Sequence, residues 1–293
     1  MKKFIIEPQY SNYKISQYLR EVQGYSGRSL RNIECYLDGK RVKTTKKVRK
    51  LNRLMVKEKD KGTDMKPIKM DLNIIYEDNN LILIDKEPYI IVHPTQKKVA
   101  KTLAHGVIHY MHEKTGKILA PRFYNRLDMN TTGIIVVAKN AYTQAFLQDK
   151  AEVKKYYQAI VKGIVEKDEF MIEKPLGKEG DELRRKVMPV EKGGQDAKTF
   201  VKVIKRYPEK DLTLVELELF TGRTHQIRAH MESLGHPILG DELYGAKDER
   251  ARRQMLHSYK LEFTNPDTLL QEIIEIELPE DMKEILRLKK VTN

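Results

Sequence analysis

The chain contains a single cysteine, Cys35, and no tryptophan among its 293 residues. One thiol cannot form a disulfide within the chain and cannot supply a thiolate-rich zinc site. Long apolar runs are also missing, since no stretch approaches the roughly 20 apolar residues that span a membrane. The N-terminal segment "MKKFIIEPQYSNYK" has an apolar run too short for a signal peptide. We therefore expect a cytoplasmic protein without membrane contact.

Several common catalytic motifs are absent as well. The sequence has no GxGxxG, GxxxxGK[ST], HExxH or GxSxG segment. These absences favour a chemistry that needs no cofactor and no metal. One alternative is a metal-dependent hydrolase, because His105, His109 and His112 share a face of a predicted helix and could hold zinc. Glu113 points elsewhere on that helix, so structural roles for these histidines are favoured.

Positive charge is what the chain has in excess. Lysine and arginine number 55 against 42 acidic residues, which leaves a net charge of +13 and a pI of about 9.4. Such an excess favours a polyanionic partner, because neutralised phosphates release their condensed counterions. A generally basic protein without a nucleic-acid partner is the alternative reading of the charge.

The chain divides into a small and a large part. Residues 1–62 are strongly basic and are expected to form a small α/β RNA-binding domain, with residues 63–72 as a polar linker containing Gly and Pro. Apolar residues at helical spacing predict two short helices in the small domain. The two stripes consist of Ile15, Leu19 and Val22 and of Leu30, Ile33 and Leu37.

Residues 73–293 are predicted to form the catalytic domain. Strand patterns such as "NLILIDK", "GIIVVAK" and "KKYYQAIVKGIV" alternate with helical patterns, but without the regularity of βαβ units. The segments "AKTFVKVIKRY" and "LTLVELELF" are expected to pair antiparallel across "PEKD". The fold class predicted is α+β, with a mixed, largely antiparallel sheet and flanking helices.

One acid stands beside an arginine in "NRLDMNTTGIIVVAKN", residues 125–140. A neighbouring cation keeps a carboxylate ionised in a partly buried pocket, so Asp128 could act as a nucleophile or a base. Arg228, in the basic segment "TGRTHQIRAH", is a candidate ion-pair partner for it. The alternative is that Asp128 only caps a turn and Arg228 lies on a helix surface.

These segments resemble the motifs of a known family. "NRLDMNTTGIIVVAKN", "KKYYQAIVKG", "LFTGRTHQIRAHMESLGHPILGDELYG" and "MLHSYKLEFTNP" occur in the order found in the RluA-like pseudouridine synthases. The resemblance spans about residues 72–285. The N-terminal segment is similar to the ribosomal-protein-type α-L RNA-binding domain, over a shorter and more degenerate stretch.

The resemblance implies a role for individual residues. Asp128 matches the catalytic aspartate, and Arg228 matches the basic residue that pairs with it. Tyr157 matches the tyrosine that packs on the base and takes part in proton removal. The substrate-binding residues that the resemblance implies are Arg126, Asn125, Arg223, His225 and Ile227. Asn125 replaces a histidine usual in the family, and Arg223 and His225 are expected to face RNA phosphates.

The function expected from the resemblance is conversion of uridine to pseudouridine on a flipped base, without a cofactor. Ribosomal RNA of the large subunit is the expected substrate, with transfer RNA as the other possibility, and a monomer is expected. The carboxylate would either attack the anomeric carbon or abstract a proton to give a glycal, and the sequence does not choose between them. A non-catalytic RNA-binding factor in ribosome assembly is the alternative function.

Overall fold

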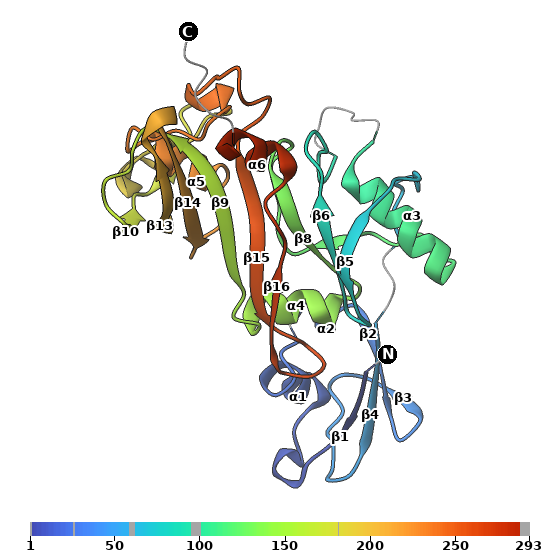
Figure 1. Cartoon of the computed structure of the whole chain (residues 1–293). Helices are drawn as coiled ribbons and strands as arrows, with labels where there is room; N and C mark the ends of the chain where they lie inside the picture. Colours follow the sequence, from blue (N-terminus) through green and yellow to red (C-terminus); the bar gives the residue numbers. More distant parts are fainter. Residues whose placement is uncertain (1, 26, 59–61, 95–100, 181, 288–293) are drawn as a thin grey trace.

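The computed structural model describes residues 2–25, 27–58, 62–94, 101–180 and 182–287. Two main sheets, one in the N-terminal part and a larger one in the rest, and a small two-stranded sheet organise the described chain (Figure 1). The family-like α+β architecture predicted from the sequence is confirmed. Within the described ranges, no helix is long and apolar enough to cross a membrane.

The N-terminal sheet is antiparallel, with strand order β1-β4-β2-β3 and two short helices. Its elements are β1 (Lys2–Ile5), η1 (Pro8–Tyr10), α1 (Ile15–Glu21), α2 (Gly27–Leu30), β2 (Ile33–Leu37), β3 (Lys40–Val42) and β4 (Arg53–Glu58). The first predicted helix is confirmed as α1, whose buried residues include Ile15 and Leu19.

The second predicted helix of this part is wrong beyond Leu30. Residues Ile33–Leu37 form strand β2 instead. Cys35 is buried together with Ile33, so the apolar positions alternate with period two as in a strand. Asp38 and Gly39 both have positive φ, 48° and 81°, and this two-residue turn returns the chain as a β-hairpin.

The larger sheet has ten strands in the order β10-β13-β14-β9-β15-β8-β6-β5, with β16 beside β15 and β7 beside β8. All of its pairs are antiparallel except β15 with β8. Its strands are β5 (Asn73–Glu77), β6 (Leu81–Lys86), β7 (Arg122–Phe123), β8 (Thr132–Ala138), β9 (Lys154–Lys162), β10 (Glu169–Glu173), β13 (Lys198–Tyr207), β14 (Leu212–Leu219), β15 (Leu256–Thr264) and β16 (Gln271–Glu275). The predicted β13–β14 hairpin is confirmed.

Helices cover both faces of this sheet. The remaining elements are α3 (Leu103–Thr115), α4 (Ala141–Asp149), the small pair β11 (Leu176–Gly177) and β12 (Lys186–Val187), η2 (Val190–Lys192), η3 (Pro208–Lys210), α5 (Gln226–Glu232), η4 (Glu242–Tyr244) and α6 (Glu280–Arg287). Strand β8 is buried along its whole length. Ile135 and Val137 belong to the core under α3, whereas Ile134 and Val136 belong to the core under α4. A strand covered on both faces reads as a continuous apolar run.

Helix α3 contains the three histidines that could have held zinc. Its first turn is capped by Thr102, whose hydroxyl lies 2.8 Å from Nδ1 of His105, and Gly116 ends it in the left-handed conformation. No group of three or more potential metal ligands occurs in the part of the chain that the structure describes. His105 therefore serves as a capping residue of the helix.

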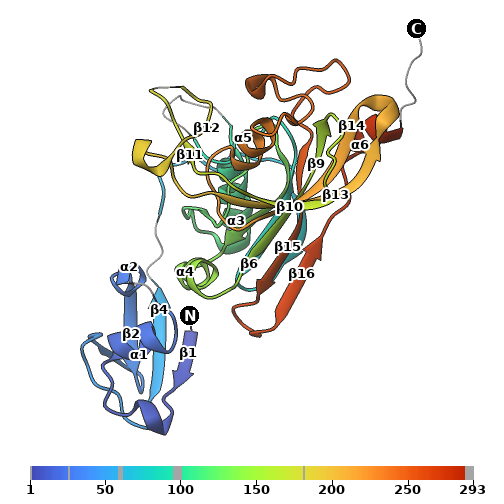
Figure 2. The same cartoon turned by 90° about the vertical axis from the view of Figure 1, so that its left-hand side faces the viewer.

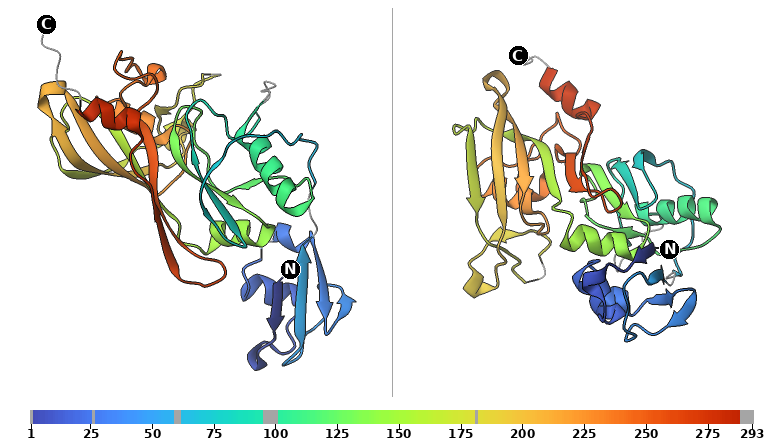
Figure 3. Two further views of the ribbon diagram at one scale, coloured as in Figure 1. Left: turned by 45° about the vertical axis from the view of Figure 1, so that its right-hand side comes forward. Right: turned by 90° about the horizontal axis from the view of Figure 1, so that it is seen from below.

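The N-terminal part packs beneath α4 of the larger part (Figures 2 and 3). The rings of Tyr25 and Tyr142 have centroids 5.1 Å apart, and Lys2 Nζ lies 4.5 Å from the centre of the Tyr142 ring. Lys2 also forms a 2.7 Å ion pair with Asp267, in the loop between β15 and β16. Residues 63–72 contain neither helix nor strand.

Candidate active site

Asp128 lies in a turn that leads into β8. Its carbonyl oxygen accepts a hydrogen bond from the Thr131 amide at 3.1 Å, which closes the turn formed by residues 128–131. This segment is called the Asp128 turn below. The carboxylate is partly accessible, with 31% of its side chain exposed. The turn role and a chemical role for Asp128 are thus compatible, because the backbone closes the turn while the side chain faces a cavity.

Arg228 reaches the same carboxylate from α5, one hundred residues later in the chain. Its Nη1 donates to Asp128 Oδ2 at 2.7 Å. The other side of the guanidinium is held by Asp241, with Nε–Oδ2 at 2.6 Å and Nη2–Oδ1 at 2.8 Å. The Tyr244 ring centre lies 5.0 Å from Cζ of the guanidinium. The sequence-based prediction of the Asp128–Arg228 pair is confirmed by this contact.

The side chains around Arg228 keep its guanidinium protonated. Burial by itself would lower the pKa of this guanidinium, but the hydrogen bonds and charge of Asp241, and then of Asp128, raise it above its ordinary value. Asp241 takes two bonds and Asp128 only one. Within the described residues, Oδ1 of Asp128 accepts no hydrogen bond, so this oxygen is available to a substrate.

Asp241 was missed by the sequence reasoning. It stands in "GHPILGDELYG". The pattern that could have indicated a buried acid is a carboxylate that follows the apolar residues of this segment. Asp241 is 1% exposed. A buried carboxylate needs a partner, and the structure shows that this partner is Arg228.

His225 lies beside this ion-pair network. It caps the N-terminus of α5 with a positive φ of 56°. Its Nε2 is 3.7 Å from Asp128 Oδ2, and its Nδ1 is 3.3 Å from the Tyr244 hydroxyl. Burial lowers the pKa of His225, although the charge of Asp128 acts in the opposite direction. The imidazole therefore lies beside the Asp128 carboxylate at the wall of the cavity.

Tyr157 forms another wall of the cavity. It lies on β9, opposite Leu217 of β14 and Ser258 of β15, and it is buried. Burial raises its pKa to about 12, a hydrogen bond from Ser258 lowers it, and the charge of Asp128 raises it further. The phenol is therefore neutral near pH 7 and offers an apolar ring face to a base.

These residues surround one cavity of about 410 Å³, which lies within the range of roughly 300–1,000 Å³ typical of small-ligand sites. All eight residues named from the sequence line it, namely Asn125, Arg126, Asp128, Tyr157, Arg223, His225, Ile227 and Arg228. Arg126 and Arg223 are exposed, whereas Ile227 is buried. Arg223 is oriented by a bond from its Nε to the Asp196 carbonyl at 2.9 Å.

Asn125 has a structural contact that the sequence did not indicate. Its Nδ2 donates to the Ile134 carbonyl at 2.9 Å, and its Oδ1 accepts from the Val136 amide at 2.8 Å. Both bonds tie the segment before the Asp128 turn to β8. A substrate contact by Asn125 stays a prediction.

A family model described as RNA pseudouridylate synthase matches residues 80–233. The RNA pseudouridine synthase YhcT of Bacillus subtilis (strain 168) is 37% identical over 250 residues, covering 81% of this chain and 82% of that protein. The ribosomal large subunit pseudouridine synthase D of Vibrio cholerae is 36% identical over 234 residues, covering 74% of this chain and 70% of that protein.

The fold has a counterpart among solved structures. The human RNA pseudouridylate synthase domain containing 1 superposes with a TM-score of 0.59 at 22% identity. The match covers 75% of this chain and 90% of the human chain. At this level of identity the likeness shows a common fold.

Proposed function

This chain belongs to the RNA pseudouridylate synthase family and is an isomerase acting on RNA; from that premise we propose that it converts specific uridines of large-subunit ribosomal RNA to pseudouridine. The proposal includes the site as well as the substrate. Asp128 is the reacting carboxylate, Arg228 holds it, and Tyr157 packs against the flipped base. Arg126, Asn125, Arg223, His225 and Ile227 contact the nucleotide.

The chemistry requires few groups. The N1–C1′ bond of uridine breaks, the uracil rotates, and C5 joins C1′; C5 loses its proton and N1 gains one. The target base must leave its stack to reach the cavity, at a cost of about a few kcal/mol. The accessible Oδ1 of Asp128 would either attack C1′ or remove a proton from the ribose to give a glycal. Both routes use only groups that this chain supplies.

The observation that carries the proposed site is the unequal sharing of Arg228. Asp241 binds the guanidinium through two bonds and is buried, whereas Asp128 binds it through one and keeps an accessible oxygen facing the cavity. A preorganised charge of this kind acts on the transition state without reorganising during the reaction.

The substrate class rests on two kinds of support. The net charge of +13 suits a polyanionic partner. Relatives from Nitrosomonas europaea, Neisseria meningitidis and Vibrio cholerae are named ribosomal large subunit pseudouridine synthase D. We expect the basic N-terminal domain to add RNA contacts.

The test has two arms. Pseudouridines are mapped in total RNA from cells with and without the protein, and we expect at least one large-subunit site to disappear; loss only in transfer RNA would overturn the substrate. In the second arm, release of tritium from C5-labelled uridine RNA is measured for Asp128→Asn. We expect no turnover, with RNA affinity within a few fold of wild type. The exposed Asp149 gives the control, since Asp149→Asn should react normally. An active Asp128→Asn protein would show that another group reacts.

A further inference from the structure

A half-buried cation in the cavity wall, Lys155, has no anion beside it among the described residues, whereas Arg126 and Arg223 of the same wall are exposed to solvent. Lys155 lies on β9, two residues before Tyr157, and alternate residues of a strand share a face. Both side chains line the cavity. In the described part of the chain, no carboxylate or other acceptor contacts the Lys155 ammonium; it lies 6.0 Å from the centre of the Tyr124 ring.

The neighbouring lysine shows the contrast. Lys154 is exposed and pairs with Glu262 at 3.8 Å. Lys155 is half-buried instead, and this burial lowers its pKa. A desolvated cation without a partner is unfavourable for the folded protein. The position is therefore suited to receive an anion from a ligand.

We propose that Lys155 binds a backbone phosphate adjacent to the target uridine. Uracil and ribose are uncharged, so a phosphate is the one anion that an RNA substrate brings to this wall. The inference rests on the proposed site, because it requires the target nucleotide to occupy this cavity. The Tyr124 ring and the phosphate would then hold the ammonium from two sides.

The test compares Lys155→Met, Lys155→Arg and the matched control Lys154→Met. RNA binding is measured at several salt concentrations. We expect Lys155→Met to bind RNA about tenfold more weakly at 0.1 M salt. The slope of log K against log salt should be reduced by about 0.7–0.9, which corresponds to the loss of one neutralised phosphate. Lys155→Arg should keep the wild-type slope, and Lys154→Met should bind within twofold of wild type.

Stability without RNA is the second readout. Since the substitution removes an unpaired desolvated cation, Lys155→Met should melt at or above the wild-type temperature. An unchanged salt slope for Lys155→Met, or equal decreases in affinity for both methionine variants, would overturn the proposal. Failure of the proposed catalytic site would appear separately, as an active Asp128→Asn protein with a normal salt slope.

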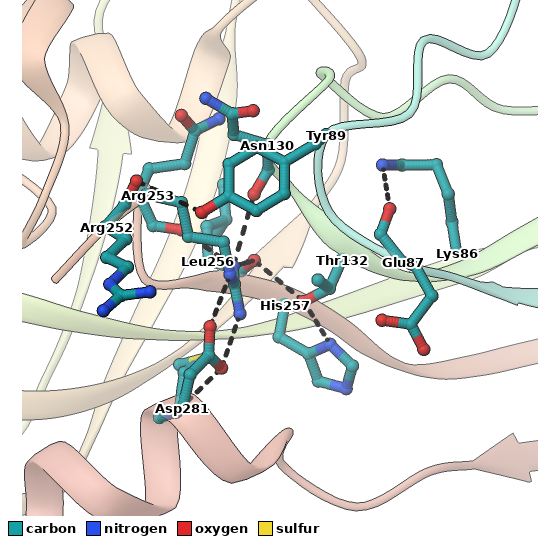
Figure 4. Close-up of polar contacts among 12 residues, drawn as sticks. Lys86, Glu87, Tyr89, Asn130, Thr132, Arg252, Arg253, Leu256, His257 and Asp281 are labelled. Atoms are coloured by element: carbon teal, nitrogen blue, oxygen red, sulfur yellow. Dashed lines mark hydrogen bonds and ion pairs between the residues drawn. The ribbon is translucent and has the colours of Figure 1, made fainter. Parts of the chain in front are cut away.

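Outside the cavity, a buried arginine contacts the backbone of the Asp128 turn. Arg253 is buried, and its Nε and Nη2 bind Asp281 of α6 at 2.7 and 2.9 Å (Figure 4). Its Nη1 donates to the carbonyls of Asn130 at 3.3 Å and Gln254 at 2.9 Å. Asp281 thus fixes the guanidinium, and the guanidinium contacts the turn.

The neighbouring residues of the turn are held in the same way. Lys86 Nζ donates to the Met129 carbonyl at 2.9 Å, and Gln254 Nε2 donates to Thr131 Oγ1 at 3.0 Å. Each of residues 129–131 therefore has a bond to a residue outside the turn. The contact through Arg253 links the turn to the C-terminal helix α6.

We infer that Arg253, fixed by Asp281, is a positioning residue for Asp128. It touches no reacting atom, and it acts by setting the backbone from which the carboxylate projects. A displacement of about 1 Å in a reacting group lowers rates by roughly a hundredfold. This inference also rests on Asp128 as the reacting carboxylate.

Single-turnover tritium release tests this role. We expect Arg253→Lys and Asp281→Asn to lower the rate at saturating RNA about tenfold, with RNA affinity within twofold. Arg206 gives the matched control, because it also joins a carboxylate, Asp168, to backbone carbonyls, but on β13. Arg206→Lys should react at the wild-type rate.

Melting temperatures accompany these rates. Asp281→Asn retains an acceptor on a side chain that is 44% exposed, so this variant folds even if substitutions of the buried Arg253 do not. A wild-type rate for folded Asp281→Asn, or an equally slow reaction for Arg206→Lys, would overturn the positioning role.

Discussion

Arg228 lies between two carboxylates whose surroundings differ. Asp241 is buried and takes both ends of the guanidinium fork, whereas Asp128 takes one nitrogen at the edge of the cavity. A bidentate pair fixes both the position and the plane of the guanidinium. Asp241 therefore orients the arginine, and the arginine orients Asp128.

Replacing Asp241 tests whether this carboxylate is the main partner of Arg228. Asp241→Asn leaves the buried Arg228 charge without its main partner, so we expect a loss of about 3–5 kcal/mol in the free energy of unfolding. Urea unfolding measures it. The exposed Asp168, which pairs with Arg206, provides the control, and Asp168→Asn should cost under about 1 kcal/mol. Similar destabilisation by both substitutions would contradict a special role for Asp241.

His257 predicts a pH dependence of stability. Burial, and after it the charge of Arg253, lower the pKa of this imidazole to about 4, from an ordinary 6.5. Between these values the unfolded chain binds more protons than the folded one. The contribution of His257 to the free energy of unfolding is therefore greatest above pH 6.5. It decreases by about 3 kcal/mol as the pH falls toward 4.

The measurement is urea unfolding between pH 4 and 7. His257→Gln removes this titration, so its stability should decline less over the same range. His109→Gln on α3 is the control and should follow the wild-type curve. If His257→Gln and wild type lose stability in parallel, the imidazole is not responsible.

At the scale of elements, β15 brings the site together. It pairs parallel with β8, which follows the Asp128 turn, and antiparallel with β9, which carries Tyr157. The parallel contact is unusually close at Gly133. A Cβ at this glycine would lie 2.2 Å from the Ser258 carbonyl oxygen, and its φ is 111°.

Gly133→Ala should therefore separate β8 from β15. The strained φ and the collision together are expected to cost roughly 2–4 kcal/mol. The melting temperature and the turnover rate should both fall, because β8 follows the Asp128 turn and β15 pairs with β9, which carries Tyr157. Gly222→Ala, where an added Cβ meets nothing within 4 Å, should melt like wild type. A stable Gly133→Ala protein would contradict the close packing.

At the scale of the molecule, the N-terminal part of the chain carries a basic groove. The groove is lined by Asn12, Val42, Lys43, Thr45, Lys46, Lys47, Val48 and Arg49. This part of the chain packs under α4 through Tyr25 and Lys2. These contacts join the part of the chain that carries the groove to the part that carries the cavity, so we expect one RNA to reach both.

Charge removal in the groove should separate binding from chemistry. For Lys43→Gln, Lys46→Gln and Lys47→Gln combined, we expect weaker RNA binding and a salt slope reduced by about 0.7–0.9 for each phosphate that the groove no longer neutralises. The single-turnover rate at saturating RNA should stay within twofold of wild type. An unchanged slope would show that this groove does not bind RNA.

Local sequence patterns were sufficient to predict many of the helices, strands and turns. The apolar run of β8, the glycine end of α3 and the turn between β13 and β14 each depend on residues near one another in the chain. The second N-terminal helix was mispredicted beyond Leu30 because Ile33 and Leu37 also fit the period of a strand once Cys35 between them is counted as apolar. Asp241 was missed because its partner lies on another element.

By itself the sequence determined the family and the sheet-rich fold and predicted the contact between Asp128 and Arg228, because the motifs that carry these residues are each contiguous in the chain. Only the tertiary structure decided how Arg228 is divided between Asp128 and Asp241, that Lys155 faces the cavity with no anion beside it among the described residues, and that α6 reaches the Asp128 turn through Arg253. These relations join segments far apart in the chain. Their energies depend on burial and on distances of a few ångströms, which no local pattern encodes.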